Sequence, residues 1–420
     1  MRIISSMLIL LFIASASNLP AQIDESKYYQ YLHEAFSRHE DDVFEYLIRE
    51  FNTYLATYPE SANNDEVLYM LGDLYLAERE VENAFCTFLK LKFLYPQSTR
   101  INDIVTSIND IVHNKAERTF RDYKVKVDEI VTNTPNFNNR LDAYYGYLQF
   151  LFELRLNDLN KFLMSDIQYY LHTFPKTAKN SDQLFLWIAE LYQKDNEWDE
   201  AIYTNYKISH LYPDSPLMPE VLFQTAYIQY RHKGSYPLAR DSFVRVITDY
   251  PQSESAGEAQ FYLAELYQER LDNTAEAIAN YRLLVETYPQ NWHAVEALKR
   301  IAEMHADSEK YQEAVAAYYQ IYELYPDNAY TPNALIEIRD LYTDRLNMYD
   351  KAIEILKLFA TQYATREDAA ECLYEAAEIY EDDLGNKQSA IDLYHEVKNK
   401  FPNSKYAERA QDRIEDLSQE

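Results

Sequence analysis

Glycine and cysteine are both scarce in this sequence, and each shortage narrows what the chain can be. The 420 residues include five glycines and two cysteines. The sequence contains no glycine-rich phosphate loop, no G-x-S-x-G motif and no long Gly/Ser linker. Cys86 and Cys372 could form a disulfide in an exported protein. Because they lie in repeats near opposite ends of the chain, we expect both to be buried as small hydrophobic residues.

Residues that commonly serve catalysis or metal binding form no recognisable motif. The nine histidines show neither an H-E-x-x-H motif nor paired-ligand spacing, and we interpret each as a helix-surface residue. The acidic stretch 381–386 lacks the alternating ligands of a calcium loop. We interpret it as a turn between helices, with calcium binding as the alternative. The sequence therefore predicts no enzyme activity, no metal site and no cofactor.

Positive charge is also in short supply. The chain has 40 Lys and Arg residues against 69 Asp and Glu residues, a formal net charge of −29. Such a chain repels phosphate backbones and anionic membrane surfaces, which excludes nucleic acid as the expected partner. The hydrophobic content of 47%, with 15% aromatic residues, is sufficient for a continuous core, so we expect an ordered chain.

Residues 1–21 differ from the rest of the sequence. A basic second residue precedes a nearly uninterrupted apolar run over 3–14, and small residues follow. This pattern is typical of a secretory signal peptide cleaved after Ala16 or Ala21, with a buried N-terminal helix as the alternative. The run is too short to span a membrane, and no cysteine follows it for a lipid anchor. We therefore expect an exported protein of the periplasm or cell envelope, with no membrane span.

The segment 259–289 shows the unit from which the rest of the chain is built. Apolar residues recur at helical spacing on both sides of a break at 271–273, which predicts two amphipathic helices. Asn273 or Thr274 can cap the second helix, and Pro289 ends it. Because one helix pair leaves an apolar face uncovered, another element must stack on it.

The same unit recurs along the chain, and its clearest marker is an aromatic residue followed by proline. The marker decays to Thr-Pro once and to Tyr-Ala once. The first residues of the markers are Tyr58, Tyr95, Thr134, Phe174, Tyr212, Tyr250, Tyr288, Tyr325, Tyr363 and Phe401. Successive markers are 37 to 40 residues apart by subtraction of these numbers, and such a period indicates a solenoid.

Small residues form a second marker at two places in each unit. An alanine precedes the marker's proline position by twelve residues: Ala84, Ala201, Ala239, Ala277, Ala314, Ala352 and Ala390. Twelve or thirteen residues earlier stand Gly72, Ala189, Ala226, Ala264, Ala302 and Ala377, with Arg339 as the exception. Two helices cross closely only where neither has a bulky side chain, so these positions predict the crossing of the paired helices.

This pattern resembles the tetratricopeptide repeat family, most clearly in the unit with Gly72, Tyr75, Ala84, Phe88 and Pro96. The Tyr-Pro-x-Ser endings are similar to those of bacterial envelope proteins of the BamD and YbgF types. The resemblance implies an all-α, right-handed superhelical solenoid of about ten helix-turn-helix repeats. It also implies a protein-interaction scaffold in which the first helix of each unit lines a concave groove.

The array is not uniform, and we divide it into four parts after the signal peptide. Residues 22–96 form N-terminal repeats, 97–175 are degenerate helical repeats, 176–402 are a regular array, and 403–420 form a capping helix with one apolar stripe. In the degenerate part, a helix over 101–121 can continue into the next one. That part is interpreted as decayed repeats, with a joint or docking face as the alternative.

The candidate binding residues surround the small position of the first helices, at six and three residues before it and one after it. They are Glu66, Tyr69, Asp73, Glu220, Phe223, Tyr227, Glu258, Phe261, Glu265, Glu296, Glu303, Asp340, Glu371, Tyr374 and Glu378. Acidic walls and an aromatic floor favour a basic or aromatic-rich extended segment, or an envelope complex, as the partner. Two alternatives remain: ordinary helix surface with aromatics packed inside each repeat, and a polysaccharide or small-molecule site in an export system.

Overall fold

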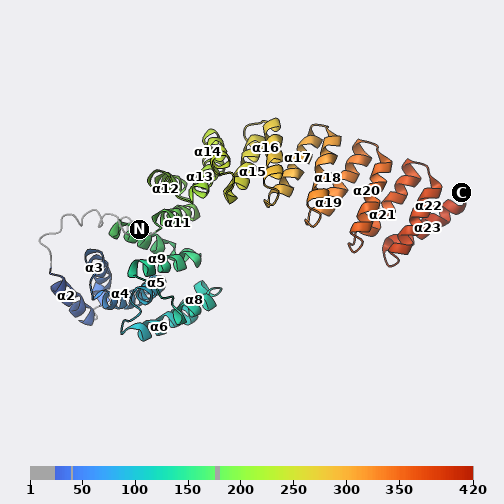
Figure 1. The fold of residues 1–420 in the computed structure, drawn as a ribbon. Coiled ribbons are helices and arrows are strands. Elements are labelled where there is room, and N and C mark those ends of the chain that lie inside the picture. The colour runs from blue at the N-terminus through green and yellow to red at the C-terminus, as the bar shows by residue number, and fades with distance from the viewer. Residues whose placement is uncertain (1–23, 39–40, 176–179, 420) are drawn as a thin grey trace. The chain divides into compact units, whose positions relative to one another are not determined.

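The computed structural model describes residues 24–38, 41–175 and 180–419, and within these ranges the chain is helical, without strands (Figure 1). The all-α prediction is confirmed, whereas the predicted signal peptide lies outside the described residues. Two compact units divide after Ser215. This boundary falls inside the segment 176–402, which the sequence suggested was one regular array.

The C-terminal unit, Pro216–Glu420, is a regular stack in which each helix packs against the next one in the chain (Figure 1). Its described part contains five helix pairs and a final single helix. The pairs are α13 (Met218–Arg231) with α14 (Tyr236–Asp249), α15 (Glu254–Glu269) with α16 (Thr274–Thr287), α17 (Ala294–Asp307) with α18 (Tyr311–Leu324), α19 (Thr331–Asp340) with α20 (Tyr349–Gln362), and α21 (Ala369–Glu378) with α22 (Lys387–Lys400). Helix α23 (Lys405–Gln419) ends the stack, and it buries Ala407, Ala410, Ile414 and Leu417 as its apolar stripe predicts.

The small residues lie at the crossing of the paired helices, as predicted. The alanines at both places are 0% exposed: Ala84, Ala189, Ala201, Ala226, Ala239, Ala264, Ala277, Ala302, Ala314, Ala352, Ala377 and Ala390. At Gly72 the approach is closer still, because an added Cβ would lie within 3.0 Å of three ring atoms of Phe88. Bulk at these positions would force the two helices apart.

A residue with left-handed backbone geometry follows the first helix of many pairs. Such residues are Arg79, Asn196, Gly234, Asp272, Glu309, Asn347 and Gly385, with φ between +46° and +63°. Only glycine adopts this conformation without steric cost. Gly234 and Gly385 therefore suit the position, whereas the other residues of this set hold a strained backbone. In the 259–289 unit, Asn273 caps the second helix, α16. Its side chain accepts a hydrogen bond of 3.2 Å from the backbone N–H of Glu276.

The N-terminal unit, Met1–Ser215, is less regular. Its helices are α2 (Glu25–Arg38), α3 (Phe44–Thr57), α4 (Asn64–Ala77), α5 (Val81–Leu94), α6 (Ile101–Asp110), α7 (Glu117–Phe120), α8 (Lys124–Thr132), α9 (Arg140–Glu153), α10 (Asn160–Thr173), α11 (Ser181–Lys194) and α12 (Trp198–Leu211). Helix α5 packs against its partner α4 and also against α9, which begins almost fifty residues later. The core of this unit is therefore closed by a long-range contact rather than by neighbours alone.

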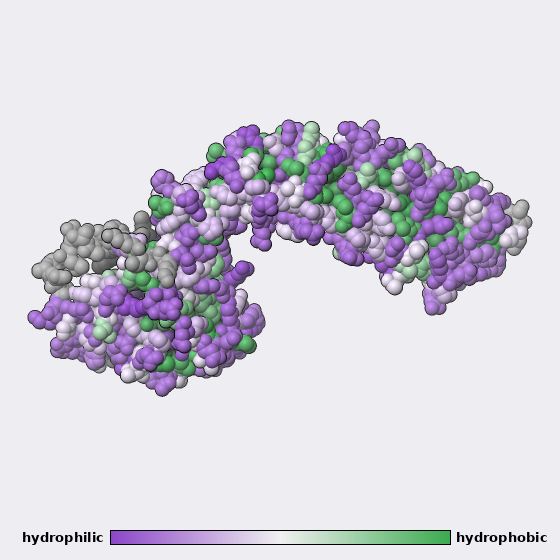
Figure 2. Space-filling model, viewed as in Figure 1, coloured by the Kyte–Doolittle hydropathy of each residue, from purple (hydrophilic) through white to green (hydrophobic). Residues whose placement is uncertain are grey.

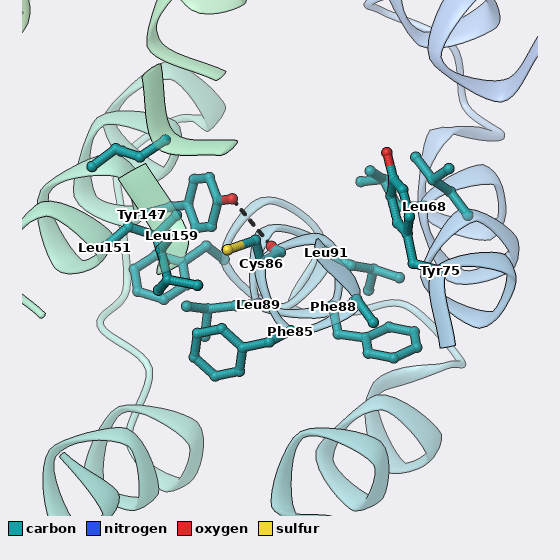
Figure 3. Close-up of a cluster of buried hydrophobic side chains, with 14 of the residues drawn as sticks. Leu68, Tyr75, Phe85, Cys86, Phe88, Leu89, Leu91, Tyr147, Leu151 and Leu159 are labelled. Atoms are coloured by element: carbon teal, nitrogen blue, oxygen red, sulfur yellow. Dashed lines mark hydrogen bonds between the residues drawn. The ribbon is translucent and has the colours of Figure 1, made fainter. Parts of the chain in front are cut away.

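Figure 3 shows this contact, with α5 between the side chains of α4 and those of α9. Phe85, Phe88 and Leu89 are fully buried. The Tyr147 hydroxyl of α9 donates a hydrogen bond of 3.1 Å to the carbonyl oxygen of Cys86. Both cysteines are free and buried, so the prediction that they are small buried hydrophobic residues is confirmed.

The expected continuous helix over 101–121 is wrong. Helix α6 ends in one π-helical turn at Ile111–Lys115, after which the chain bends at Ala116 and again before α8. The bends bring Phe120 onto Phe85 of α5, with 4.5 Å between ring centroids. Burial of this aromatic pair stabilises the bent course of the chain.

Candidate partner-binding site

The candidate residues lie on the first helices of the pairs, but they differ in exposure. Phe261, Glu265 and Tyr374 are each only 4% exposed, so they cannot present an open floor or wall. Glu371 is exposed. The others are half-buried: Glu66, Tyr69, Asp73, Glu220, Phe223, Tyr227, Glu258, Glu296, Glu303, Asp340 and Glu378.

A residue of the following repeat explains much of this burial. In helices α4, α15 and α21, an aromatic residue stands three positions before the small residue. This aromatic residue is covered by the residue that stands four positions after the proline at the end of the same repeat. We call that second residue the covering residue. The covering contacts are Arg100 on Tyr69 (4.3 Å to the ring centroid), His293 on Phe261 (3.8 Å between centroids, 8° between planes) and Tyr406 on Tyr374 (5.4 Å). Each aromatic residue is thus enclosed at a junction of two repeats.

Cations of the chain itself neutralise many of the predicted acidic residues. Arg100 donates two hydrogen bonds to the Glu66 carboxylate, at 2.8 and 2.5 Å, while its guanidinium lies over Tyr69. Other candidate acids have cationic partners as well: Glu296 with Arg300, Glu303 with Lys299, and Asp340 with Arg339. With Glu265, five of the ten acidic candidates of the predicted acidic walls are therefore in ion pairs with cations of the chain itself.

The buried Glu265 is one of these paired acids. Its carboxylate accepts hydrogen bonds from Arg231 on the preceding first helix and from Tyr230. Burial raises the pKa of Glu265, and the charge of Arg231 opposes that shift. Because this charge is buried and compensated inside the protein, Glu265 holds α13 and α15 together and is not available to a partner.

The last repeat is closed in a similar way by α23. Arg409 lies 5.0 Å from the centroid of Tyr374 and 5.5 Å from that of Tyr406. Burial raises the pKa of Glu378, and the positive charge of Arg409 opposes this shift. Arg409 stands seven residues after a proline, where Glu66, Glu220, Glu258 and Glu296 stand in other repeats, so the terminal helix inverts the charge of that position.

One group of residues in the C-terminal unit is half-buried around an exposed tryptophan, and we call it the acidic–aromatic patch. It consists of Glu220, Phe223, Tyr227, Glu258, Tyr262 and Trp292. Its rings form a chain of contacts: Tyr227 to Tyr262 at 5.0 Å, Phe223 to Tyr262 at 5.9 Å, and Tyr262 to His293 at 5.5 Å. Figure 2 shows, on one face, hydrophobic residues of this unit interspersed with hydrophilic ones rather than gathered into one broad apolar surface.

The two carboxylates of the patch have polar partners but, among the described residues, no cation within ion-pair distance. Glu220 accepts hydrogen bonds from Gln224 at 2.9 Å and from Ser255 at 3.1 Å. Burial raises the pKa of Glu258, and the nearby negative charge of Glu220 raises it further, whereas a hydrogen bond with Trp292 lowers it. A cation placed here would favour the charged form of Glu258 and offset its burial.

Trp292 is the most exposed part of the patch. It is 72% exposed, in the loop before α17, and its ring lies over His293 with 3.4 Å between centroids. Sequence reasoning missed both residues, and it was wrong to interpret every histidine as a surface residue, because His293 is 5% and His305 8% exposed. Position in the repeat could have identified His293, because it stands four residues after Pro289, just as Arg100 stands four residues after Pro96.

Within residues 24–38, 41–175 and 180–419, no three His, Cys, Asp or Glu side chains converge to hold a metal ion. None of the described helices has the length and apolar character to cross a membrane.

Comparison with known proteins agrees with the repeat architecture. Three segments match the tetratricopeptide repeat family: 220–253, 258–291 and 371–404. They coincide with the pairs α13–α14, α15–α16 and α21–α22.

Three of the similar solved structures share 14–17% identity with this chain. A tetratricopeptide repeat protein from Parabacteroides merdae ATCC 43184 has 14% identity and a TM-score of 0.36, covering 66% of this chain and 99% of that one. PilF of Pseudomonas aeruginosa has 14% identity and a TM-score of 0.32, covering 55% and 96%. PilW, a type IV pilus biogenesis factor, has 17% identity and a TM-score of 0.31, covering 56% and 100%.

No curated protein matches the sequence. The family matches coincide with equivalent helix pairs of one stack, and the C-terminal unit contains tetratricopeptide repeats.

Proposed function

We propose that this chain is a non-catalytic scaffold that binds a positively charged segment of a partner protein at the acidic–aromatic patch. Tetratricopeptide repeats support a role in protein interaction. The apolar pattern of residues 1–21 supports a location in the periplasm or cell envelope, where the scaffold would assist assembly of an envelope complex.

One observation carries the proposal. Glu220 and Glu258 have no cationic partner among the described residues, whereas the equivalent Glu66 and Glu296 are paired with arginines. Glu258, which is close enough to Glu220 to feel its charge, is hydrogen-bonded to Trp292, and Trp292 is 72% exposed. Carboxylates next to exposed aromatic rings attract a lysine or arginine by charge and by cation–π interaction, worth about 0.5–2 kcal/mol for each ring contact.

The test is binding of a defined probe, a fluorescein-labelled twelve-residue peptide with four lysine or arginine residues, measured by fluorescence anisotropy. The double variant Glu220→Gln, Glu258→Gln is expected to bind it roughly tenfold more weakly, because two contacts of about 0.7 kcal/mol each are lost. The matched control is Glu286→Gln, Glu323→Gln, which removes the same charge from the second helices α16 and α18. Equal weakening by both variants would show non-specific attraction to an acidic protein and would refute the proposal.

A stability measurement separates loss of binding from loss of fold. Since burial raises the pKa of Glu258, the charged carboxylate costs folding free energy at neutral pH. We expect Glu258→Gln to be at least as resistant to urea as the wild type while binding the probe less tightly.

The exposed Trp292 also favours a second candidate function, polysaccharide binding, because sugars stack on indole rings. A glycan array in the absence of protein partners tests it. Binding of a neutral glycan that Trp292→Ala abolishes, and that the Gln variants of Glu220 and Glu258 leave intact, would favour this candidate.

A further inference from the structure

We infer that the patch contains a subsite for one arginine side chain of the partner, formed by Glu258, His293, Tyr262 and Trp292. The inference rests on the proposed function, because it names the side chain that the patch recognises. The guanidinium would pair with the Glu258 carboxylate, donate a hydrogen bond to Nε2 of His293 and lie against the aromatic rings.

The chain itself shows which group fills such a position. In the N-terminal unit the covering residue is Arg100, which lies over Tyr69 and bonds the Glu66 carboxylate twice. In the last repeat Arg409 lies over Tyr374. At the junction of α15 and α17 the covering residue is His293, so the helix that carries Glu258 is covered by an imidazole where Arg100 supplies a guanidinium to the helix that carries Glu66.

His293 has an unused hydrogen-bonding atom. The residue is 5% exposed, and its Nε2 is buried without a hydrogen-bond partner in the described structure. Burial lowers the pKa of His293 to about 4, although Glu296 opposes the shift. The ring is therefore neutral at physiological pH, and its nitrogen without a proton is an acceptor.

Trp292 is the part of the subsite that can move. Its ring lies over His293, yet 72% of the residue is exposed. The indole is held by its contact with His293 and its hydrogen bond with Glu258, and because its outer face is in solvent, a partner side chain can displace it from the histidine or enter beside it. Such a movement would uncover the His293 ring and release the Glu258 carboxylate from its hydrogen bond with Trp292.

Arginine suits this combination better than lysine. A guanidinium is planar, stacks on aromatic rings and presents five donors in a fixed arrangement, so it can bond a carboxylate and an imidazole together. A lysine ammonium is a compact, strongly hydrated charge that gains less from flat rings. The subsite therefore distinguishes two residues that a merely acidic surface would bind equally.

The experiment compares three fluorescein-labelled peptides of identical length whose single variable residue is arginine, lysine or citrulline, each flanked by the same second arginine. With the full chain, the arginine peptide is expected to bind about tenfold more tightly than the lysine peptide, and the citrulline peptide most weakly. His293→Phe keeps the stacking on Phe261 but removes the acceptor, so it should remove the preference for arginine.

A second variant tests the subsite from the opposite direction. His293→Arg supplies the guanidinium from the chain itself, as Arg100 does in the N-terminal unit, and should weaken binding of all three peptides by tenfold or more. His305→Phe is the matched control, because it also replaces a buried histidine of this repeat but lies outside the patch, and its binding should equal that of the wild type. Circular dichroism confirms that each variant is folded.

The outcomes separate this inference from the proposed function. Equal binding of the arginine and lysine peptides, with His293→Phe and His293→Arg unchanged, overturns the arginine subsite while the acidic patch stands. If the wild type binds neither cationic peptide, or if the Gln variants of Glu220 and Glu258 bind as tightly as the wild type, the proposed function fails and the subsite fails with it.

Discussion

Replacing Gly72 by alanine tests the helix crossing on which the repeat depends. The added Cβ would lie within 3.0 Å of three ring atoms of Phe88, and Phe88 is 0% exposed. Because the ring is enclosed on all sides, α4 and α5 must separate or the ring must leave its preferred rotamer. Overpacking of this kind costs about 1–3 kcal/mol, and the better helix propensity of alanine returns about 1 kcal/mol. Because the Cβ would lie so close to the enclosed ring, we expect the overpacking cost to exceed the propensity gain, with a net destabilisation of up to about 2 kcal/mol.

Gly146 provides the matched control. It also lies inside a helix, α9, and its added Cβ would lie within 3.0 Å of two ring atoms of Phe137. Phe137, however, is half-buried in the non-helical segment before α9, which can shift. Gly146→Ala should therefore keep most of the propensity gain and be neutral or stabilising by up to about 1 kcal/mol.

Urea denaturation followed by circular dichroism measures both variants. The midpoint should fall for Gly72→Ala and stay or rise for Gly146→Ala. Phe88→Leu should relieve the clash, so the double variant Gly72→Ala, Phe88→Leu should be more stable than the sum of the single changes implies. If Gly72→Ala stabilises the chain as much as Gly146→Ala does, the crossing tolerates bulk and the reasoning about the small positions is refuted.

Three further predictions concern stability. Glu309→Gly should raise the melting temperature and stabilise the fold by about 0.5–1 kcal/mol, because φ is +57° at this residue. Gly385→Ala, at φ +61°, should lower the melting temperature and destabilise the fold by a similar free energy. Melting temperatures of both variants that move in the same direction in calorimetry would contradict this. Between pH 8 and pH 5 the free energy of unfolding of the wild type should fall by about 2 kcal/mol relative to that of His293→Phe. The reason is that the pKa of His293 is about 4 in the folded chain and 6.5 in the unfolded chain, so below pH 6.5 the unfolded chain binds the extra proton. Urea midpoints of the two proteins that run parallel across this range would show that the imidazole is solvated. Ala277→Leu should cost roughly 1–3 kcal/mol at the crossing of α15 and α16, and an unchanged melting temperature would show that Ala277 does not lie at the crossing.

The sequence predicted the features that depend on neighbouring helices. Each small position, such as Ala264 or Ala277, follows from the packing of a helix against its own partner, and that packing repeats with the period of the chain. The cap at Asn273 and the apolar stripe of α23 are likewise local. These features recur at fixed distances, so one sequence contains many examples of the same rule.

Two kinds of feature were not predictable in this way. The contact between α5 and α9 joins segments separated by the irregular stretch around α6 to α8, and no periodicity indicates it. The enclosure of Phe261 by His293 was missed because periodicity assigns a face to each helix but does not show which side chain of the next repeat covers that face. The exposure of the candidate binding residues, and therefore the location of the candidate site, could be determined only from the structure.

The covering residues have a consequence for how such arrays diversify. Because the side chain that completes each surface belongs to the following repeat, the information for one contact is divided between two segments of the gene about 38 residues apart, the usual spacing of the markers. Duplication or deletion of a whole repeat would thus create a new junction and a new local chemistry even if no codon inside either repeat changed. Recombination alone could give such a chain new specificities without disturbing the alanines that hold the helices together.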